Sequence, residues 1–386
     1  MRKNFRKFGA IMLAGVMTAG MLAGCGSGSG SSSASASSGG AASSASKSAS
    51  SSSGSANASK DAASSGKSSG SLSVYTAFPE AEVEYYFQKF EEQTGIKCNY
   101  VRLSAGEMLT RVAAEKDNPQ AALMLGGSTD NYINMEDQGL IEPYQSKALS
   151  DTPENLLDPK GGWDPIYVGC IAFACNKEWF EDKGYDYPKS WNDLLDEKYK
   201  NEIIMAHPST SGTAYTVLAT LVQLMGEDQA FDYMKKLSGN ITQFTKSGSA
   251  APNAVAQGEA AIAITFSHDG LQPTAEGYPI ELSFPDDGTG YEVGACALIK
   301  NGPADEQENA KKFIDWMTST DGQNLYAENG SFRVPTNSKA TVADGLVTLD
   351  QVKCIDYDAT WAADNKSTLT ARFESDVIAA PEEDAK

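Results

Sequence analysis

A run of hydroxyl side chains stands where a predicted strand is followed by a predicted helix. Residues 203–206 form a short apolar stretch typical of a buried strand, and Pro208 ends it. The segment Ser209-Thr210-Ser211-Gly212-Thr213 follows, with good N-cap residues before an apolar helical run. The first backbone N–H groups of a helix are unpaired and its dipole is positive there, so a phosphate or carboxylate can bind without Lys or Arg. We predict an anion site, the alternative being an ordinary capped helix.

Other predicted strands end in similar polar turns. They are residues 76–78, 104–106, 126–129 and 247–249. Ligands of open α/β sheets bind beyond the carboxyl ends of the strands, so we expect these turns to line one cleft. Ser104 and Glu107 also have the spacing of a capping box, which explains the hydroxyl by helix capping alone.

A second group of polar residues can recognise hydroxyl groups. His268 and Asp269 follow the predicted strand 260–266, and Glu292 precedes the predicted strand 293–299. Their side chains suit hydrogen bonding to a sugar, although each could equally belong to a cap or a solvated loop. All candidate ligand-binding residues lie at strand ends: Thr76, Ser104, Gly106, Gly127, Ser128, Ser209, Ser211, Gly212, Thr213, His268, Asp269 and Glu292.

No catalytic constellation stands out in the part of the sequence expected to fold. It contains no G-x-S-x-G nucleophile elbow, no P-loop and no His-rich metal cluster, so we assign no catalytic residue, metal ligand or cofactor. An enzyme acting on a phosphate ester remains an alternative. A surface adhesin is a third class, but it would not explain hydroxyl groups at helix starts.

The beginning of the chain predicts export and lipidation. Residues 1–24 combine four basic side chains with an uncharged apolar run too short to span a membrane, which indicates a signal peptide. Leu22-Ala23-Gly24-Cys25 resembles the bacterial lipobox, which predicts a diacylated Cys25 as a membrane anchor. The Ser/Ala/Gly-rich segment up to Ser71 cannot form a core, so residues 25–71 are expected to be a disordered tether.

Charge and cysteine content limit the possible partners. Removing residues 1–24 takes away four basic and no acidic side chains, which lowers the formal net charge from −20 to −24. A chain this acidic repels a phosphate backbone, so we expect no nucleic-acid partner. Five cysteines remain after Cys25 without any C-x-x-C spacing, which indicates neither a disulfide framework nor a zinc site and leaves one disulfide open.

The first folded segment has the pattern of a parallel α/β sheet. Predicted strands at 72–76, 96–103 and 121–125 alternate with predicted helices at 79–94 and 105–114. A βαβαβ order of this kind favours right-handed crossovers and a parallel sheet. We therefore predict a first lobe over residues 72–171.

A second lobe is predicted over residues 172–290. It is entered by the long apolar strand 166–175, and Ser190-Trp191 is expected to open a helix inside it. The strand 293–299 leads back, so residues 291–386 are assigned to a return to lobe 1 followed by C-terminal helices. Two long apolar strands around the second unit are what a double crossing between lobes needs.

Six segments match a known family in its order: Val74-Tyr75-Thr76-Ala77, Gly95-Ile96-Lys97, 121–127, Ser190-Trp191-Asn192-Asp193-Leu194-Leu195-Asp196, Ser211-Gly212-Thr213 and Gly258-Glu259-Ala260-Ala261. On these segments the chain from about residue 72 to 356 resembles a type II periplasmic substrate-binding protein of an ABC importer, in its ferric-ion-binding-like branch. The resemblance implies an α/β fold of two lobes with parallel or mixed sheets, a double crossing hinge and a ligand cleft between the lobes. It also implies a monomer that delivers a small solute to ABC permease subunits driven by an ATPase.

The resemblance does not carry over the ligands of iron. Ferric-binding members use a His after the first strand, a Glu after the third, and a Tyr-Tyr pair in the second lobe. Here those places hold Phe78 or its neighbours, Gly126-Gly127 and Ser267-His268, which give no anionic oxygen donor for Fe³⁺. The set resembles instead members that bind phosphorylated sugars, with a His-Asp pair and a Glu on the sugar and Ser/Thr-rich helix ends on the phosphate. A small anionic solute is expected, and ferric iron is the alternative within the family.

Overall fold

The computed structural model describes residues 70–379. The predicted signal peptide and Cys25 lie outside these residues. So does the predicted tether, except that Gly70 and Ser71 already belong to the first strand. Among residues 70–379, no helix is both long enough and apolar enough to span a bilayer.

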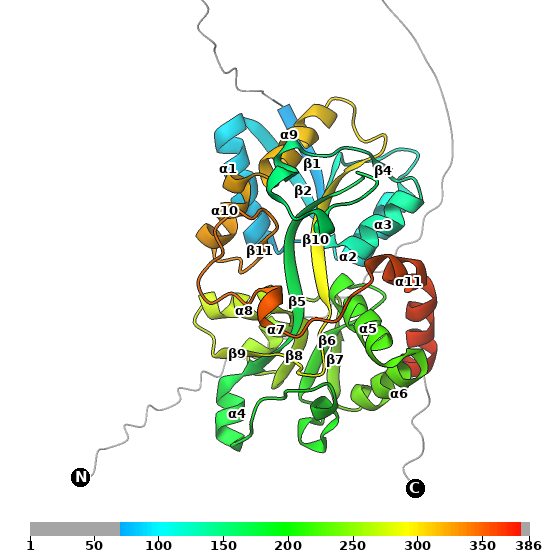
Figure 1. Cartoon of the computed structure of the whole chain (residues 1–386), viewed down its shortest axis with the longest axis vertical. Coiled ribbons are helices and arrows are strands. Elements are labelled where there is room, and N and C mark those ends of the chain that lie inside the picture. The colour runs from blue at the N-terminus through cyan, green and yellow to red at the C-terminus, as the bar shows by residue number, and fades with distance from the viewer. Residues whose placement is uncertain (1–69, 380–386) are drawn as a thin grey trace, which may run out of the picture. The chain divides into compact units, whose positions relative to one another are not determined.

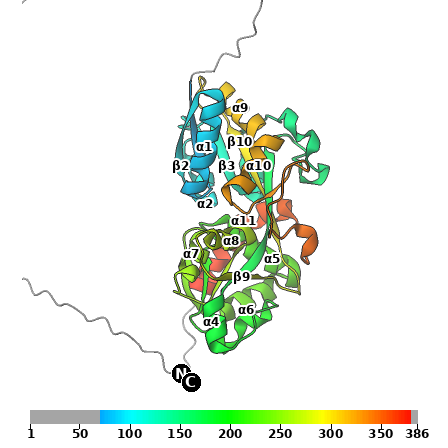
Figure 2. The same ribbon diagram turned by 90° about the vertical axis from the view of Figure 1, so that its left-hand side faces the viewer.

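Two mixed β-sheets are joined through one shared strand, as Figures 1 and 2 show. Sheet A has the order β2 (Ile96–Arg102), β1 (Gly70–Thr76), β3 (Leu123–Ser128), β10 (Tyr291–Ile299) and β5 (Asp164–Asn176), with β4 (Ile141–Glu142) on β10 and β11 (Val334–Pro335) on β5. Sheet B has the order β5, β8 (Ile262–Phe266), β6 (Ile203–Ala206) and β7 (Ile241–Thr245), with β9 (Ile280–Ser283) on β5. The strands β1, β2 and β3 pair in parallel, while β10 runs antiparallel to β3 and β5.

Helices cover both sheets. Around sheet A lie α1 (Glu80–Thr94), α2 (Ala105–Ala114), α3 (Thr129–Asp137), α9 (Gln307–Met317) and α10 (Thr320–Asn329). Around sheet B lie α4 (Lys177–Lys183), α5 (Gly212–Met225), α6 (Glu227–Ser238), α7 (Ala250–Ala256), α8 (Ser267–Ala275) and α11 (Ala359–Phe373). The predicted architecture of two mixed α/β lobes is therefore present.

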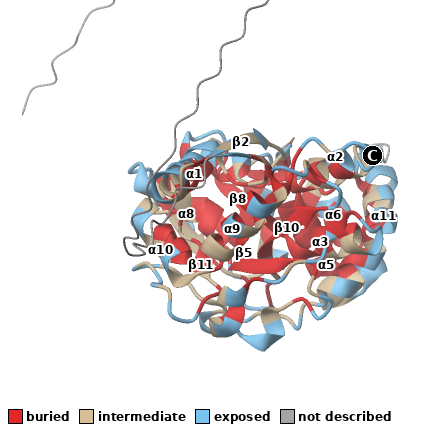
Figure 3. Cartoon of the chain, turned by 90° about the horizontal axis from the view of Figure 1, so that it is seen from above, coloured by how far each residue is buried: buried red, intermediate tan, exposed pale blue. Residues whose placement is uncertain are grey.

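The strand β5 crosses from one lobe to the other. All of its 13 residues are buried. Its first half pairs with β10, and Ile171–Cys175 pair with β8 in the second sheet. Seen from above, buried residues gather around β5 and β10 while exposed residues lie at the rim (Figure 3). Because an interior strand of this length is apolar on both faces, the sequence signal for it was strong.

Local capping rules explain most helix ends. The side chain of Ser104 accepts a hydrogen bond from the Glu107 amide, and Glu107 reaches back to the Ser104 amide, so the predicted capping box is present. Gly95 ends α1 with φ of 77°, a left-handed conformation that glycine adopts without strain.

The helix expected to open at Ser190-Trp191 is absent. Only a short 3₁₀ turn forms at Asn192–Leu195. The Asp193 carboxylate accepts hydrogen bonds from two preceding backbone amides, and Asp196 adopts an extended conformation and caps the next turn. These local side-chain contacts compete with helix extension.

The end of the chain does not stay with the first lobe. Residues 291–329 return to sheet A through β10, α9 and α10. The segment around Lys353–Ile355 then runs beside Thr289, bonded to both its amide and its carbonyl. It leads into α11, whose Ala362, Leu369 and Phe373 belong to the hydrophobic core of lobe 2. A third segment therefore accompanies the two crossing strands.

A buried carboxyl group at the start of β5 predicts a pH-dependent stability. Asp164 is 1% exposed, and its Oδ2 accepts a hydrogen bond from the Ser146 amide at 2.9 Å while Oδ1 has no partner. Burial raises its pKa from 3.8 to about 7. The folded protein holds this proton more tightly than the unfolded chain, so stability falls as the pH rises from 3.8 to about 7.

Asp164→Asn should remove this dependence. We expect the variant to lose less stability than wild type between pH 5 and 8, by on the order of 1–3 kcal/mol. Urea unfolding at several pH values measures the difference. Asp182→Asn, at an exposed position of α4, is the control and should follow wild type. Parallel pH profiles for wild type and Asp164→Asn would contradict the prediction.

Candidate ligand-binding site

A small cavity of ≈ 50 Å³ lies where the two lobes meet. Of the twelve predicted site residues, nine line it: Ser104, Gly127, Ser128, Ser211, Gly212, Thr213, His268, Asp269 and Glu292. Further lining residues are Ala77, Arg102, Ala105, Tyr167, Ser247, Gly248, Ser249, Phe266 and Arg333. Both lobes contribute, so the cavity exists only while they are in contact.

Three helices begin at one side of this cavity. Ser104, Ser128 and Ser211 are the N-cap residues of α2, α3 and α5. The side chains of Ser104 and Ser211 cap their own helices, but Ser128 caps no amide of α3. Its Oγ instead accepts a hydrogen bond from Asn131 Nδ2 at 3.2 Å. The first amides of α3 are thus available to an anion.

The lobes approach one another closely at these helix starts. A Cβ atom on Gly212 would lie 2.9 Å from Ser128 Oγ and 3.1 Å from the Ala105 side chain, both in the other lobe. The Gly106 amide donates to the Thr210 carbonyl across the same gap at 3.2 Å. The absence of a side chain at Gly212 therefore allows the contact between the lobes.

The cation Arg102 lies near the helix starts. Arg102, at the end of β2, donates from Nη2 to Ser249 Oγ at 3.3 Å. Ser249 belongs to the turn 247–249, whose Gly248 carbonyl accepts a hydrogen bond from Thr265. The turn is held in place by β8, and Arg102 ties it to lobe 1.

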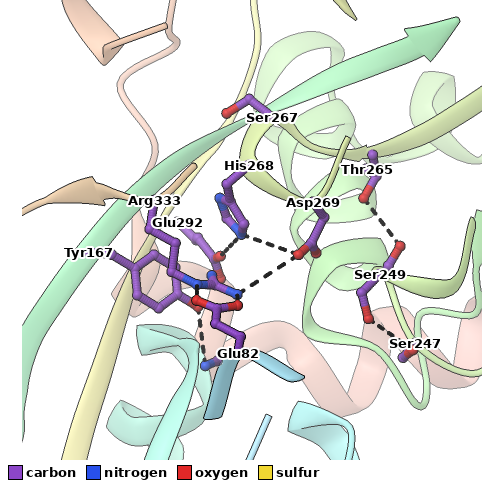
Figure 4. A network of polar contacts seen from close by, with 12 residues as sticks. Glu82, Tyr167, Ser247, Ser249, Thr265, Ser267, His268, Asp269, Glu292 and Arg333 are labelled. Carbon is purple, nitrogen blue, oxygen red and sulfur yellow. Dashed lines mark hydrogen bonds and ion pairs between the residues drawn. The ribbon is translucent and has the colours of Figure 1, made fainter. Parts of the chain in front are cut away.

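The other side of the cavity gathers ionisable groups, shown in Figure 4. His268 and Asp269 lie on the first turn of α8, and Glu292 lies on β10. His268 Nε2 is 3.5 Å from Glu292 Oε1 and 3.8 Å from Asp269 Oδ1. The imidazole stacks on Phe266, and its other nitrogen faces the backbone of Gly169, which leaves no room for a Cβ atom there.

Burial sets the protonation of this cluster. It holds the pKa of His268 well below its usual value, with a further contribution from Arg333. It raises the pKa of Glu292 well above its usual value and that of Asp269 to about 6. Burial therefore favours the neutral forms of His268 and Glu292, beside an Asp269 that is mostly ionised near pH 7. Such a mixture of donors and acceptors suits hydroxyl groups.

Arg333 is the main residue of the cavity that the sequence did not indicate. Its guanidinium group is 3% exposed and bonds Glu82 at 2.6 and 3.0 Å. It lies 4.3 Å from the ring centroids of both Phe78 and Tyr167, and its Nη2 is 3.9 Å from Asp269 Oδ1. No local pattern could reveal it, because its ion-pair partner lies 251 residues away in the sequence.

Three predicted residues do not line this cavity. Thr76 is fully buried, and its hydroxyl accepts a hydrogen bond from the Phe78 amide, which shapes the turn after β1. Ser209 bonds Glu374 of the C-terminal segment. Gly106 contacts the other lobe through its amide, at the outer edge of the helix starts. These three residues are structural neighbours of the cavity rather than parts of its wall.

The described residues show no metal site. Within residues 70–379, no group of three or more His, Cys, Asp or Glu side chains is arranged to hold a metal ion. The five cysteines in this range are all unpaired. Tyr85 and Tyr86, the adjacent tyrosine pair, lie in α1, where Tyr86 is buried and bonds Glu82.

Two α/β lobes joined by crossing strands, with a polar cavity between them, define a type II periplasmic binding protein. Comparison with known proteins is consistent with this class. Residues 127–360 match the family model of bacterial extracellular solute-binding proteins. The chain belongs to this family.

Individual relatives place the chain within the family. An uncharacterized protein of Haemophilus influenzae is 39% identical over 293 residues, which cover 74% of this chain and 84% of the relative. The structure of the periplasmic binding protein AfuA from Actinobacillus pleuropneumoniae, with fructose-6-phosphate bound, is 35% identical with a TM-score of 0.78, covering 81% of this chain and 100% of that one. The ferric binding protein of Campylobacter jejuni is 24% identical with a TM-score of 0.66, covering 79% and 98%, and shows the shared fold alone.

The predicted fold class and branch are therefore confirmed. The chain is an extracellular solute-binding component of an ABC transporter, and its family consists of binding proteins rather than enzymes. The alternative hypotheses of a phosphate-ester enzyme and of an adhesin are therefore rejected. The identity of the solute is to be inferred from the residues that line the cavity.

Gly212→Ala should weaken ligand binding without unfolding the protein. The added methyl group would contact Ser128 Oγ and Ala105 across the gap, and opening the lobes relieves this contact. We expect at least about a 10-fold loss of affinity for the transported solute, because a cost of about 1.4 kcal/mol on closure already lowers affinity 10-fold. Calorimetry and thermal melting measure the two effects. Gly239→Ala, at the end of α6, is the control, and equal affinities for both variants would contradict the prediction.

Proposed function

We propose that this protein captures a phosphorylated sugar, or a closely related phosphate or phosphonate compound, and delivers it to an ABC permease. The observation that carries the proposal is that two chemically different groups of residues line one cavity. Helix starts with hydroxyl groups and Arg102 line one side, and His268, Asp269 and Glu292 line the other. A ligand with an anionic end and a hydroxyl-rich end matches both.

The side formed by the helix starts fits a phosphate group. Phosphate oxygens accept hydrogen bonds from backbone amides and hydroxyl groups, and the starts of α2, α3 and α5 offer both. Arg102 adds one charged donor at the rim. Charge-assisted hydrogen bonds of this kind are worth roughly 1.5–3 kcal/mol each.

The side formed by α8 and β10 fits sugar hydroxyls. Ionised Asp269 accepts hydrogen bonds, the raised pKa of Glu292 favours a carboxyl group that can donate one, and neutral His268 carries no positive charge that would hold a second phosphate there. The similar protein AfuA holds fructose-6-phosphate in its solved structure, and this compound has the same two kinds of end. That likeness supports the proposal.

The same groups argue against ferric iron as the cargo. Fe³⁺ prefers several anionic oxygen donors, above all carboxylate and phenolate groups. In this cavity burial raises the pKa of both Glu292 and Tyr167, and Asp269 faces the cation Arg333. Binding of Fe³⁺ would require these buried groups to ionise together. That ionisation costs more free energy than it would for the same groups in a solvent-exposed iron site.

Binding of fructose 6-phosphate tests the proposal. At about a hundred times its dissociation constant the ligand should stabilise the fold by roughly 2.7 kcal/mol, a clear shift in melting temperature. Asp269→Ala and Glu292→Ala should each reduce this shift strongly, because they remove partners of the sugar. Their effect on the shift with inorganic phosphate should be smaller, since phosphate alone would occupy the helix starts.

A matched change far from the cavity provides the control. Glu281→Ala removes a partly exposed carboxylate on β9 that pairs with Lys177, and it should leave both melting shifts unchanged. Tight Fe³⁺ binding with the colour of a tyrosinate complex, together with no response to any phosphorylated compound, would overturn the proposal.

We also propose that Cys25 anchors the protein to the outer face of the bacterial cytoplasmic membrane. The motif Leu22-Ala23-Gly24-Cys25 after an apolar signal segment supports this, and the following Ser/Ala/Gly-rich segment would give the lobes reach to the permease. Cys25→Ala should block lipidation and abolish partitioning into the detergent phase of a Triton X-114 extract. Equal partitioning of wild type and Cys25→Ala would refute the anchor.

A further inference from the structure

A buried lysine of the C-terminal helix lies behind the helix starts of the cavity. Lys366, on α11, is 9% exposed. Its Nζ donates to Asp130 Oδ2 and to Asn131 Oδ1, both at 2.6 Å, and Nζ lies 4.6 Å from the ring centroid of Tyr215. Asp130 and Asn131 are on α3 of lobe 1, while Tyr215 is on α5 of lobe 2. One ammonium group therefore contacts both lobes.

The helix that carries Lys366 is fixed to lobe 2. Its Leu369 and Phe373 belong to the core of that lobe, and Arg372 pairs with Glu227 and Asp228 at the start of α6. An opening that moves α3 away from lobe 2 while these contacts stay in place would separate Lys366 from Asp130. The bond between them is a lobe-to-lobe contact outside the cavity wall.

A chain of hydrogen bonds joins this lysine to the cavity. Asn131 accepts from Lys366 with its Oδ1 and donates from its Nδ2 to Ser128 Oγ at 3.2 Å and to the Ser128 carbonyl at 3.3 Å. Ser128 lines the cavity, and the Asn131 side chain is fully buried. The lysine thus fixes which way the Asn131 amide faces, and the amide orients the Ser128 hydroxyl.

We propose that Lys366, Asp130 and Asn131 form an interlobe latch that favours the closed form and positions Ser128 for the ligand. Lys366 acts through Asn131 and is a positioning residue. Another lobe-to-lobe ion pair, Lys246 with Glu107, is much more exposed, with 70% of the lysine side chain accessible. Exposed ion pairs contribute little because water replaces the lost contact at small cost. Water does not so easily replace the partners of a buried ammonium group that makes two hydrogen bonds.

Two variants separate latching from a purely structural role. Lys366→Met leaves the buried Asp130 without its cationic partner, so the melting temperature should fall, and the cleft should open more often. The double variant Asp130→Asn/Lys366→Met removes both charges, so the melting temperature should recover most of the loss. The latch stays broken in both variants.

Hydrogen exchange measured by mass spectrometry on the ligand-free protein reports the opening. We expect faster exchange in both variants for peptides covering the starts of α3 and α5, with unchanged exchange in β6 and β8 of the lobe core. Affinity for fructose 6-phosphate should fall at least about 10-fold in both, because apparent affinity scales with the population able to close. Lys177→Met, which removes a partly exposed lysine paired within lobe 2, is the control and should match wild type in every measurement.

The two variants give outcomes that either support or refute the latch. If exchange and affinity recover together with the melting temperature in the double variant, the ion pair is only structural and the latch is refuted. Wild-type exchange at the cleft in both variants refutes it as well. Should Lys366→Met fail to fold, the double variant carries the test alone. The exchange measurement uses no ligand, so a failure of the proposed sugar phosphate to bind would leave the result on the latch intact.

Discussion

The arrangement between the lobes depends on one buried guanidinium group. Arg333 bonds Glu82 of α1 and faces Asp269 of α8, and its charge also lowers the pKa of Glu292 on β10 against the larger effect of burial. Taking three carboxyl groups out of water beside one cation is unfavourable unless some of them stay protonated. Burial raises the pKa of Glu292 in line with this need, and the neutral carboxyl group that it favours can donate a hydrogen bond. The charge balance of the core thus determines the chemistry that the cavity can offer.

Much of the frame was predictable because its signals are local. The crossing strand β5 is a continuous apolar run, the capping box at Ser104 needs only four consecutive residues, and Gly95 ends α1 at the position that favours a left-handed residue. The polar turns at strand ends follow from the same logic, since the order of strands and helices decides which edge they share. Nine residues predicted in this way do line one cavity, and their role in binding remains a prediction.

The parts that could not be predicted depend on partners far apart in the sequence. Arg333 and Glu82 are separated by 251 positions, and Lys366 and Asp130 by 236. In the sequence each is one charged residue among many, and nothing nearby distinguishes a buried charge from a solvated one. Phe332 precedes Arg333 with φ of 55°, a conformation unusual for a bulky side chain that only the surrounding packing can maintain. The absent helix at Ser190 has the opposite cause, because local hydrogen bonds of the Asp193 carboxylate to the two preceding amides compete with a helix there.

An acidic protein that takes up an anion must overcome the repulsion of its own surface. The formal net charge is −20, but at physiological salt the field of exposed carboxylates is screened beyond about 8 Å. Inside the cavity the nearest groups are amides and hydroxyls at the starts of α2, α3 and α5, with Arg102 as the cation beside them. Such neutral donors bind an anion strongly only where water is excluded, and water returns to them once the lobes separate. In the proposed function this makes affinity depend on closure, so that a ligand held firmly between the lobes is released when they open at the permease.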